Sequence, residues 1–556
     1  MNLLHRFVNQ VDFASQEDFE QHFSLVVPEA FNYGFDVVDE MARLAPDQTA
    51  IVWTNPQGEE HLFTFRDVMV QSNKTANYLR SLGIGKGDPV MLILKRHYQF
   101  WFTLVALHKL GAVAIPATHQ LMVHDLVYRN QSASVKAIIC TGEGHVAGAV
   151  EQSLPESPTV KTLLMVHGHR EGWLDLDAGV AAASKDFARP QGDMANTNDD
   201  TMIMFFSSGT TGMPKMVAHS YTYPLGHVIT GKYWHNCLDG GLHFTISDTG
   251  WGKALWGKIY GQWICGSAVM VYDFDKFVPS EILGILQKYR VTTFCAPPTM
   301  YRFMIREDLS QYDFSALTYC NTAGEAMNPE VFNIWKAATG LPPKEGFGQT
   351  ETTLTVMTSI YTEAKPGCMG LFSPGYKVDI VDEDGAPCEA GQVGEVVVHT
   401  ENGAPAGMFQ GYYRNEQRTR EAWHDGLYHT GDTAWRDADG YLVYVGRTDD
   451  IIKSSGYRIG PFEVESALME HPAVLECAIT GVPDPIRGQV IKATIVLNRG
   501  FEGTDTLKKE LQDHVKHTTA PYKYPRVVEF VEELPKTISG KIRRVELRQR
   551  DSQAQA

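Results

Sequence analysis

The sequence predicts an α/β protein in two parts, a large N-terminal domain over residues 1 to 448 and a smaller α+β domain over residues 449 to 556. Length is the first reason, because 556 residues exceed what one hydrophobic core usually holds. Pattern is the second, because short apolar runs alternate with helical periodicity from residue 36 onward. Such alternation is typical of parallel strands covered by helices.

The clearest β/α unit lies between residues 88 and 141. "DPVMLILK" (88–95), "AVAIPA" (112–117) and "VKAIICT" (135–141) are continuous apolar runs and predict buried strands. "YQFWFTLVALHKLG" (98–111) has helical periodicity and ends at Gly111, which favours a C-cap. His108 and Lys109 interrupt the most apolar window, so we expect a buried helix there and no membrane span.

The pattern changes after about residue 366. "YKVDIVDEDGAPC" (376–388), "GEVVVHT" (394–400) and "YHTGDTAWRDADGYLVYVGR" (428–447) are short alternating strands with tight turns, and they predict a small antiparallel barrel. In the C-terminal part, the pattern predicts a helix over 460–474, a strand over 490–498, a helix over 505–519 and a strand over 525–534. We therefore place the domain boundary at residue 449.

Composition narrows the class of protein. A formal net charge of −17 argues against nucleic acid as a partner. The eight cysteines form no C-x-x-C pair and the first 23 residues lack an apolar core, so we expect reduced thiols, no signal or transit peptide, and a cytoplasmic protein. Zinc at His235, Cys237 and His243 is conceivable, but without a second ligand pair ordinary packing is favoured.

The most distinctive loop is "FFSSGTTGMPKMVAHS" (205–220), which follows the apolar run "TMIMFF". Its glycines let the backbone approach a ligand closely, and its hydroxyl groups and Lys215 are suited to phosphate oxygens. It is not a Walker A loop, because Met213 and Pro214 separate the second Gly from the Lys. Taken alone, the loop is also compatible with a flexible Ser/Gly linker.

Four further motifs follow the loop along the chain: "EGFGQTETT" (345–353), "YHTGD" (428–432), "GRTDDIIKSSGYRIGPFEVE" (446–465) and "PKTISGKIRR" (535–544). In this order the set resembles the acyl-adenylate-forming superfamily, which includes acyl-CoA synthetases, luciferases and peptide-synthetase adenylation domains. The resemblance extends from about residue 36 to the end and is greatest to medium-chain acyl-CoA synthetases. It implies the fold of that family, with a mobile C-terminal domain that turns about a hinge at Asp449.

The resemblance also implies a reaction in two halves. A carboxylic acid and ATP, with Mg²⁺, form acyl-AMP and pyrophosphate, and CoA then takes the acyl group. The implied ATP- and AMP-binding residues are Ser207, Ser208, Gly209, Thr210, Thr211, Gly212, Lys215, Gly324, Glu325, Ala326, Glu345, Gly346, Phe347, Gly348, Gln349, Thr350, Asp432, Arg447, Arg458 and Lys541.

Particular roles follow from the same resemblance. Lys541, Thr350 and Glu351 are the implied catalytic residues, and Glu351 with Thr211 would hold the metal ion. Phe347 would stack on adenine and Asp432 would accept hydrogen bonds from the ribose. The implied CoA-binding residues are Ser455, Gly456, Tyr457, Arg487 and Lys523, with Arg526 as a further candidate.

The acid is predicted from an acyl pocket formed by "DTGWGKALW" (248–256), Trp251 and Gly252 above all, with Ala323 and Gly348. Acetyl-CoA synthetases resemble the chain but carry Trp at the position of Gly348, so we expect room for a C4–C10 acid, branched acids included. Benzoate-like acids, short-chain acids and the loading of a separate carrier protein remain alternatives, as does a non-catalytic nucleotide-binding protein. A homodimer is compatible with the sequence.

Overall fold

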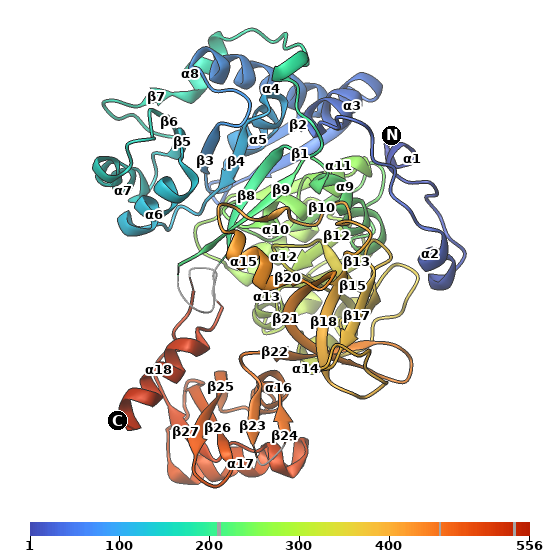
Figure 1. Cartoon of the computed structure of the whole chain (residues 1–556), viewed down its shortest axis with the longest axis vertical. Coiled ribbons are helices and arrows are strands. Elements are labelled where there is room, and N and C mark those ends of the chain that lie inside the picture. The colour runs from blue at the N-terminus through green and yellow to red at the C-terminus, as the bar shows by residue number, and fades with distance from the viewer. Residues whose placement is uncertain (208–212, 455–456, 538–540, 556) are drawn as a thin grey trace.

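The structure is a computed structural model and describes residues 1–207, 213–454, 457–537 and 541–555. The fold is α/β, as predicted, with two large sheets in the N-terminal part (Figure 1). The first has eight strands, in the order β19 (Gly411–Tyr412), β9 (Lys215–Ser220), β8 (Thr201–Ser207), β4 (Val113–Pro116), β3 (Pro89–Ile93), β5 (Ala137–Thr141), β6 (Thr162–Val166) and β7 (Leu174–Asp175).

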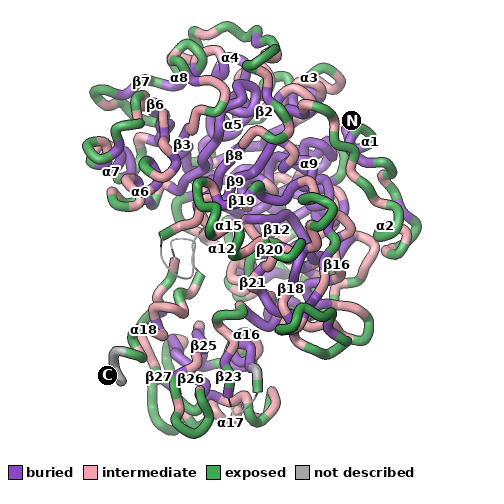
Figure 2. The backbone as a smooth tube through the Cα atoms, viewed as in Figure 1, coloured by how far each residue is buried: buried purple, intermediate pink, exposed green. Residues whose placement is uncertain are grey.

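The second large sheet has nine strands and carries most of the predicted site. Its order is β16 (Leu371–Phe372), β15 (Leu354–Met357), β14 (Pro343–Gly348), β13 (Tyr319–Ala323), β12 (Thr293–Ala296), β10 (Leu242–Thr245), β11 (Ala268–Tyr272), β1 (Thr49–Thr54) and β2 (Glu60–Thr64). The strands from β13 to β1 run parallel, and their apolar residues are buried on both faces (Figure 2).

Helices cover both sheets. They are α1 (Leu4–Phe7), α2 (Gln16–His22), α3 (Glu40–Leu44), α4 (Phe65–Ser81), α5 (Gln99–Leu110), α6 (Val123–Ala133), α7 (Val146–Ser153), α8 (Leu176–Ala182), α9 (Tyr223–Val228), α10 (Gly252–Trp256), α11 (Tyr260–Ile264), α12 (Pro279–Lys288), α13 (Pro298–Met304), α14 (Pro329–Thr339) and α15 (Glu416–Ala422). A π-helical segment, Ile229–Trp234, continues α9.

Helix α5 shows how a charged residue is tolerated in this core. All its residues are buried, and it ends at Gly111, whose φ of 78° is left-handed, as the sequence predicts. The ammonium of Lys109 donates to Asp39 at 2.5 Å, to Asn73 at 2.7 Å and to Ser72 at 3.1 Å. Burial is possible because every donor of the charged group has a partner.

A five-stranded antiparallel sheet follows, as the alternating pattern predicts. It consists of β17 (Val378–Val381), β18 (Gly394–His399), β21 (Leu427–Arg436), β20 (Trp423–His424) and β22 (Leu442–Arg447). The hairpin of β21 and β22 turns at "DADG", which sets Asp432 opposite Arg447 on neighbouring strands.

The C-terminal part has its own sheet and core. The strands are β24 (Tyr457–Ile459), β23 (Ile452–Ser454), β26 (Gly488–Leu497), β25 (Val474–Asp484) and β27 (Val527–Phe530), and the helices are α16 (Pro461–Met469), α17 (Asp505–Thr518) and α18 (Arg544–Gln555). The core of this part contains Ile459, Leu468, Ile479 and Leu511. Figure 1 shows it as a lobe beside the larger body. The boundary at residue 449 stays a prediction.

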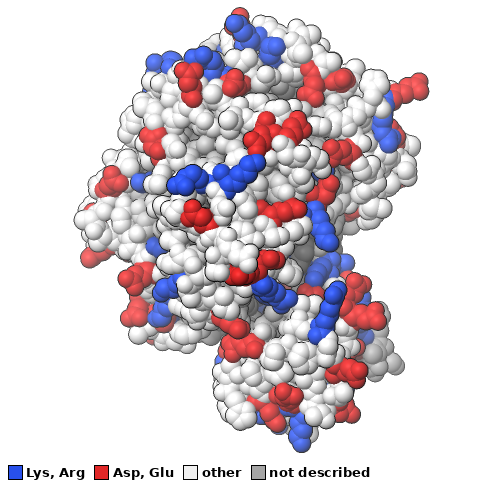
Figure 3. Space-filling view, turned by 180° about the vertical axis from the view of Figure 1, so that it is seen from behind, with Lys and Arg blue, Asp and Glu red and all other residues white. Residues whose placement is uncertain are grey.

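The surface agrees with the composition. Acidic and basic side chains are interspersed over the face shown in Figure 3. Within the described residues, no helix combines the length and the apolar character that crossing a membrane requires.

Candidate active site

A cavity of about 2050 Å³ is bounded by residues of both the large domain and the C-terminal lobe. Most of the predicted site residues that the structure describes line it. They are Ser207, Lys215, Trp251, Gly252, Ala323, Gly324, Glu325, Ala326, Glu345, Gly346, Phe347, Gly348, Gln349, Thr350, Glu351, Asp432, Arg447 and Lys541. Residues more than 300 positions apart in the chain therefore meet at one cavity.

Several predicted residues fall outside what the structure describes. These are Ser208, Gly209, Thr210, Thr211, Gly212, Ser455 and Gly456. The backbone of Arg458 lies in β24, and its side chain is likewise outside the described part. Their roles stay predictions.

The wall at residues 322–326 and the motif at 345–351 emerge from neighbouring strands. Strands β13 and β14 are parallel, and Ala323 is paired with Gly346 near their carboxyl ends. Ligands of α/β sheets commonly bind beyond these ends. Gly324 has φ of 106°, which an L-side chain rarely adopts, so glycine is needed for the turn that leaves the sheet.

Asp432 lies at the centre of a hydrogen-bond network. Its Oδ2 accepts from Gln349 Nε2 at 2.5 Å and from Arg447 Nη1 at 3.1 Å, and its Oδ1 accepts from Tyr444 Oη at 3.0 Å. Gln349 in turn accepts from Tyr428 Oη at 2.7 Å. Burial raises the pKa of the Asp432 carboxyl, and Arg447 and Gln349 oppose that rise. The network holds one carboxylate rigidly at the cavity wall.

Glu351 and Lys215 form a second polar group beside the described end of the Ser/Gly loop. Tyr412 Oη donates to Glu351 Oε1 at 2.9 Å, and Lys215 Nζ lies 3.9 Å from the same oxygen. Glu351 Oε2 has no hydrogen-bond or ion-pair partner among the described residues, so it is suited to a hard cation. Burial lowers the pKa of Lys215, while Glu351 acts in the opposite direction.

Lys541 reaches the same cavity from the C-terminal lobe. Its backbone is tied to Thr537, because Thr537 N donates to Lys541 O at 2.7 Å and Lys541 N donates to Thr537 Oγ1 at 3.1 Å. Its charge is close enough to contribute to the pKa values of Asp432 and of Lys253. The structure thus brings Lys541 to the cavity, within electrostatic range of both residues.

The predicted acyl pocket contains more residues than the sequence indicated. Trp251, Gly252, Ala323 and Gly348 line the cavity, as predicted. Aromatic and polar residues of β8, α9, the π-helical segment after it and α10 complete this end: Phe205, Tyr223, His227, Thr230, Lys253 and Trp256. Lys253 and Trp256 belong to the predicted segment 248–256, and the other four belong to no motif. Their only signal was aromatic residues near Trp251 and the loop, which a buried core would also show.

Gly348 has a structural constraint that the sequence did not reveal. A Cβ built on it would lie 2.1 Å from the carbonyl oxygen of Thr353. The backbone at this β14–β15 irregularity therefore accommodates no side chain without shifting. The absence of an indole here is a packing requirement as well as an opening of the pocket.

The predicted CoA residues that the structure describes, Tyr457, Arg487, Lys523 and Arg526, do not line the cavity in this conformation. Tyr457 is half exposed and stacks on Tyr522 with ring centroids 4.0 Å apart. Lys523 forms an ion pair with Glu463, and Arg487 is exposed on the same lobe. In this conformation Lys541 lines the same cavity as Lys215, Glu351 and Asp432, whereas Tyr457, Arg487 and Lys523 do not.

Asp449 lies between β22 and β23, where the chain passes from one lobe to the other. Its Oδ1 is 3.8 Å from Arg447 Nε. The adjacent Asp450 pairs with Arg544 at 3.7 Å and with Arg548 of α18. These pairs, which connect the last helix to the crossover, were not predicted from the sequence.

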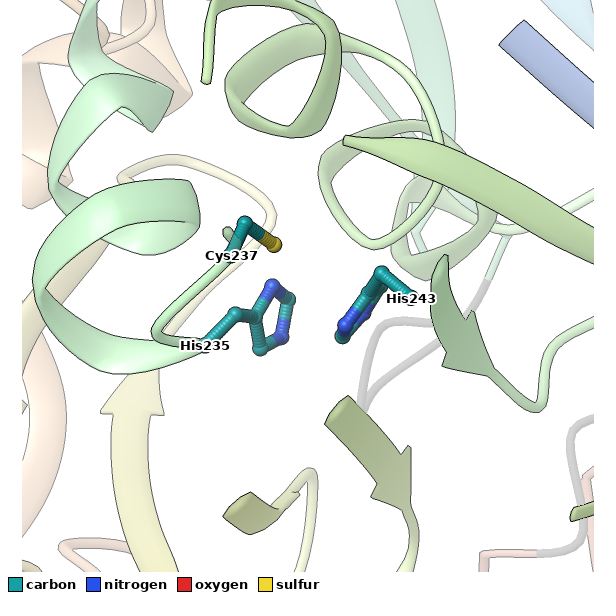
Figure 4. Close-up of side chains that lie close together, drawn as sticks. All are labelled: His235, Cys237 and His243. Carbon is teal, nitrogen blue, oxygen red and sulfur yellow. The ribbon is translucent and has the colours of Figure 1, made fainter. Parts of the chain in front are cut away.

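His235, Cys237 and His243 do come together in the core, with one ligand atom of each within 4.8 Å of the others (Figure 4). Both nitrogens of His243 are engaged, with Thr293 and Thr245 hydroxyls at 2.7 Å. A tetrahedral zinc ion at about 2.0–2.3 Å from its ligands would have to displace one of them. Ordinary packing remains the favoured interpretation.

Comparison with known proteins decides the family. The AMP-binding enzyme model matches residues 38–413, and the model of the AMP-binding enzyme C-terminal domain matches residues 463–541. The chain belongs to the AMP-binding enzyme family. The resemblance inferred from the five motifs is thereby confirmed.

The relatives are acyl-CoA synthetases, as predicted. Mitochondrial acyl-coenzyme A synthetase ACSM3 of Mus musculus is 41% identical over 557 residues, covering 98% of this chain and 95% of the relative. Mitochondrial ACSM4 of Rattus norvegicus is 42% identical over 535 residues, covering 94% and 91%. The anthranilate CoA ligase AuaEII, solved with anthranoyl-AMP, has a TM-score of 0.86 at 28% identity, covering 95% and 99%.

One expectation is wrong. From the sequence we expect a cytoplasmic protein, whereas these curated relatives are named as mitochondrial proteins. The expectation depended on the lack of an apolar core in the first 23 residues and on scattered, unpaired cysteines, all eight of which are free and buried in the structure. Free thiols indicate a reducing environment and do not identify the compartment.

Proposed function

We propose that this AMP-forming acid–CoA ligase activates a medium-chain carboxylic acid of the C4–C10 range, branched acids included, and transfers the acyl group to CoA. The observation that carries the proposal is the character of the acyl end. Trp251, Trp256, Tyr223 and Phe205 surround it, and Gly348 adds no side chain. Apolar walls favour each further methylene by about 0.8 kcal/mol until the pocket is full.

In the first half-reaction, one oxygen of the acid attacks the α-phosphorus of ATP and pyrophosphate leaves. Lys541 supplies a compact positive charge to the oxygens on which negative charge accumulates. Asp432 binds the ribose hydroxyls, and Arg447 holds that carboxylate in place. Lys215 and the loop before it neutralise the outgoing phosphates.

Mg²⁺ belongs to this proposal. Glu351 fits a hard cation, because one carboxylate oxygen is held by Tyr412 and the other is uncommitted among the described residues. Thr211 would be a second ligand. When bound, the ion would spread the charge of the phosphates. A role in fatty acid metabolism and a homodimer also remain proposals.

An aromatic acid is the second candidate. Aromatic side chains dominate the acyl end, and a structural neighbour is a ligase of anthranilate. A flat ring would stack on these side chains, whereas an alkyl chain would only fill the volume. The selectivity between aromatic and aliphatic acids depends on the shape of the pocket. It can be measured by comparing kcat/KM for the two classes of acid.

The test is AMP formation with ATP, Mg²⁺ and CoA across acetate, butyrate, 2-methylbutyrate, hexanoate, octanoate and benzoate. We expect the highest kcat/KM among the C4 to C8 acids. A maximum at acetate would contradict the medium-chain assignment, and a maximum at benzoate would select the second candidate. ATP–pyrophosphate exchange without acyl-CoA formation would mean that the acceptor is not CoA.

A further inference from the structure

A histidine–aspartate pair lies on the cavity wall, and its Asp248 begins the predicted acyl segment 248–256. His119 follows β4 of the eight-stranded sheet, and Asp248 follows β10 of the nine-stranded sheet. Both line the cavity, and His119 Nδ1 lies 3.4 Å from Asp248 Oδ2. The His119 side chain is 25% exposed and that of Asp248 is 13% exposed. The imidazole is therefore accessible, and the carboxylate next to it is the less exposed of the two.

Asp248 is held as an anion that orients the imidazole. Its Oδ1 accepts from Gly250 N at 2.8 Å. Burial raises the pKa of this carboxyl, but His119, Arg96 and the Gly250 amide together outweigh it, and the pKa lies below its ordinary value. His119 Nδ1 is buried without a hydrogen bond, and the Asp248 carboxylate at 3.4 Å is the charged group next to it. A carboxylate near Nδ1 favours the tautomer with the proton on that nitrogen, which leaves Nε2 as the acceptor.

Nε2 of His119 is uncommitted, because it has no hydrogen bond to any residue in the described ranges. The loop that bears His119 packs closely on the loop that bears Trp251. A Cβ built on Gly250 would lie 2.3 Å from Thr118 N, so only glycine permits this approach. His119 is thereby fixed beside the predicted acyl pocket.

Other charged groups surround the pair. Arg96 donates to Phe274 O at 2.7 Å and Lys95 pairs with Asp275 at 2.6 Å. His119 and Arg96 contribute to lowering the pKa of Asp275, although its hydrogen bond with Lys95 is the largest cause. Lys258 is buried nearby, and burial lowers its pKa to about 7.

We propose that His119 is the general base of the second half-reaction, with Asp248 as its positioning residue. This inference depends on the proposed function. The S–H bond of the CoA thiol breaks and its proton moves to His119 Nε2, while the sulfur forms a bond to the acyl carbon. The bond from that carbon to the AMP phosphate oxygen then breaks, and AMP leaves with the electron pair. The imidazolium afterwards releases its proton to water.

The chemistry favours such a group. A thiol of ordinary pKa, about 8.5, is mostly protonated at neutral pH, and only the thiolate is a good nucleophile. A positioned base typically contributes about 10²–10⁴-fold to such a step. His119 belongs to the large domain, so it stays beside the acyl group if the C-terminal lobe turns about Asp449.

The experiment separates the two half-reactions in His119→Gln. ATP–pyrophosphate exchange reports adenylation, and single-turnover transfer from enzyme-bound acyl-AMP to CoA reports the second step. We expect exchange within about threefold of the parent and transfer slowed roughly 10²-fold. The transfer rate of the variant should also keep rising with pH through thiol ionisation, whereas the parent reaches a plateau earlier.

Asp248→Asn should give a smaller loss of transfer with an altered pH profile, because the amide no longer holds the tautomer. The matched control is His124→Gln, since His124 is an exposed histidine of α6 with 78% of its side chain accessible. It should leave both half-reactions unchanged.

Two results would overturn the assignment. Unchanged transfer in His119→Gln would exclude a base role, and equal loss of both half-reactions would indicate a structural role. Both differ from failure of the proposed function, in which the parent enzyme itself forms no acyl-CoA with any acid.

Discussion

The two ends of the cavity are built in opposite ways. At the proposed nucleotide end, Asp432 is hydrogen-bonded to Arg447, Gln349 and Tyr444. At the proposed acyl end, Trp251 and Trp256 line the wall from α10 and the turn before it, and Tyr223 lines it from α9. The first end is a network of directional hydrogen bonds, whereas the second is defined by the shape and volume of its apolar walls.

The difference explains what each end tolerates. A buried carboxylate that loses one donor retains the full penalty of an unsatisfied charge, so every member of the nucleotide network is needed. An apolar wall can change in volume and still exclude water, so one member can be exchanged with a graded effect. We therefore expect substitutions at the nucleotide end to abolish activity and those at the acyl end to change which acid is preferred.

The largest effect is expected at Lys541. Lys541→Ala removes the charge that the C-terminal lobe brings to the cavity, and ATP–pyrophosphate exchange should fall roughly 10²–10³-fold. Substrate binding should change far less, because the charge acts mainly where negative charge develops. The measurement is exchange rate against acid and ATP concentration.

Lys508→Ala is the matched control, since Lys508 lies on α17 of the same lobe and its side chain is 39% exposed. It should leave exchange intact. If Lys541→Ala retained most of its exchange activity, the nucleotide end would function without the C-terminal lobe, and the proposed role of Lys541 would be wrong.

Much of the nucleotide end is predictable because its residues lie close together in sequence or symmetrically about a turn. Asp432 and Arg447 flank the "DADG" hairpin, so their opposition follows from strand pairing. The wall at 322–326 and the motif at 345–351 follow adjacent parallel strands, which the β/α pattern also implies. Strand pairing and the order of neighbouring strands therefore suffice to predict the arrangement of this end.

The contacts of the acyl end and of the His119–Asp248 pair cannot be predicted in this way. Trp256 lines the cavity because of how α10 is docked, and His119 meets Asp248 because two separate sheets end at one place. The Gly348 backbone constraint depends on Thr353, across a register shift between β14 and β15. These contacts are set by packing between elements, which one sequence does not disclose.

An intermediate effect is expected at Trp256, which tests the acyl end directly. Its ring lies 5.9 Å from those of Trp234 and His235, and it lines the cavity. Trp256→Leu should enlarge the pocket and shift preference to longer acids, by about fourfold per methylene accommodated. The measurement is kcat/KM for butyrate, hexanoate, octanoate and decanoate.

The internal control for Trp256→Leu is the KM for ATP, which should stay within about twofold of the parent value. Trp256→Phe should shift the preference less, because it removes less volume. If all acids lost activity equally, Trp256 would support the fold and not the chain-length limit, and the two ends would be less separable than we propose.

The smallest effect concerns Glu345, on the strand that joins the two ends. Its Oε2 accepts from Met327 N at 3.2 Å, and its Oε1 is buried without a partner among the described residues. Burial raises the pKa of this carboxyl from 4.5 to about 8. The folded protein therefore keeps a proton that the unfolded chain releases, and the free energy of unfolding falls as pH rises from about 4.5 to about 8.

Glu345→Gln removes this titration, so the variant should gain stability relative to the parent between pH 5 and pH 8, by an amount on the order of 1–3 kcal/mol. Thermal unfolding at several pH values measures it, with exposed Glu171→Gln as the control that should follow the parent. A parallel pH dependence in Glu345→Gln and the parent would mean that Glu345 is ionised when buried. The strand between the two ends would then carry a charge, and the division of the cavity into a charged end and an apolar end would have to be redrawn at β14.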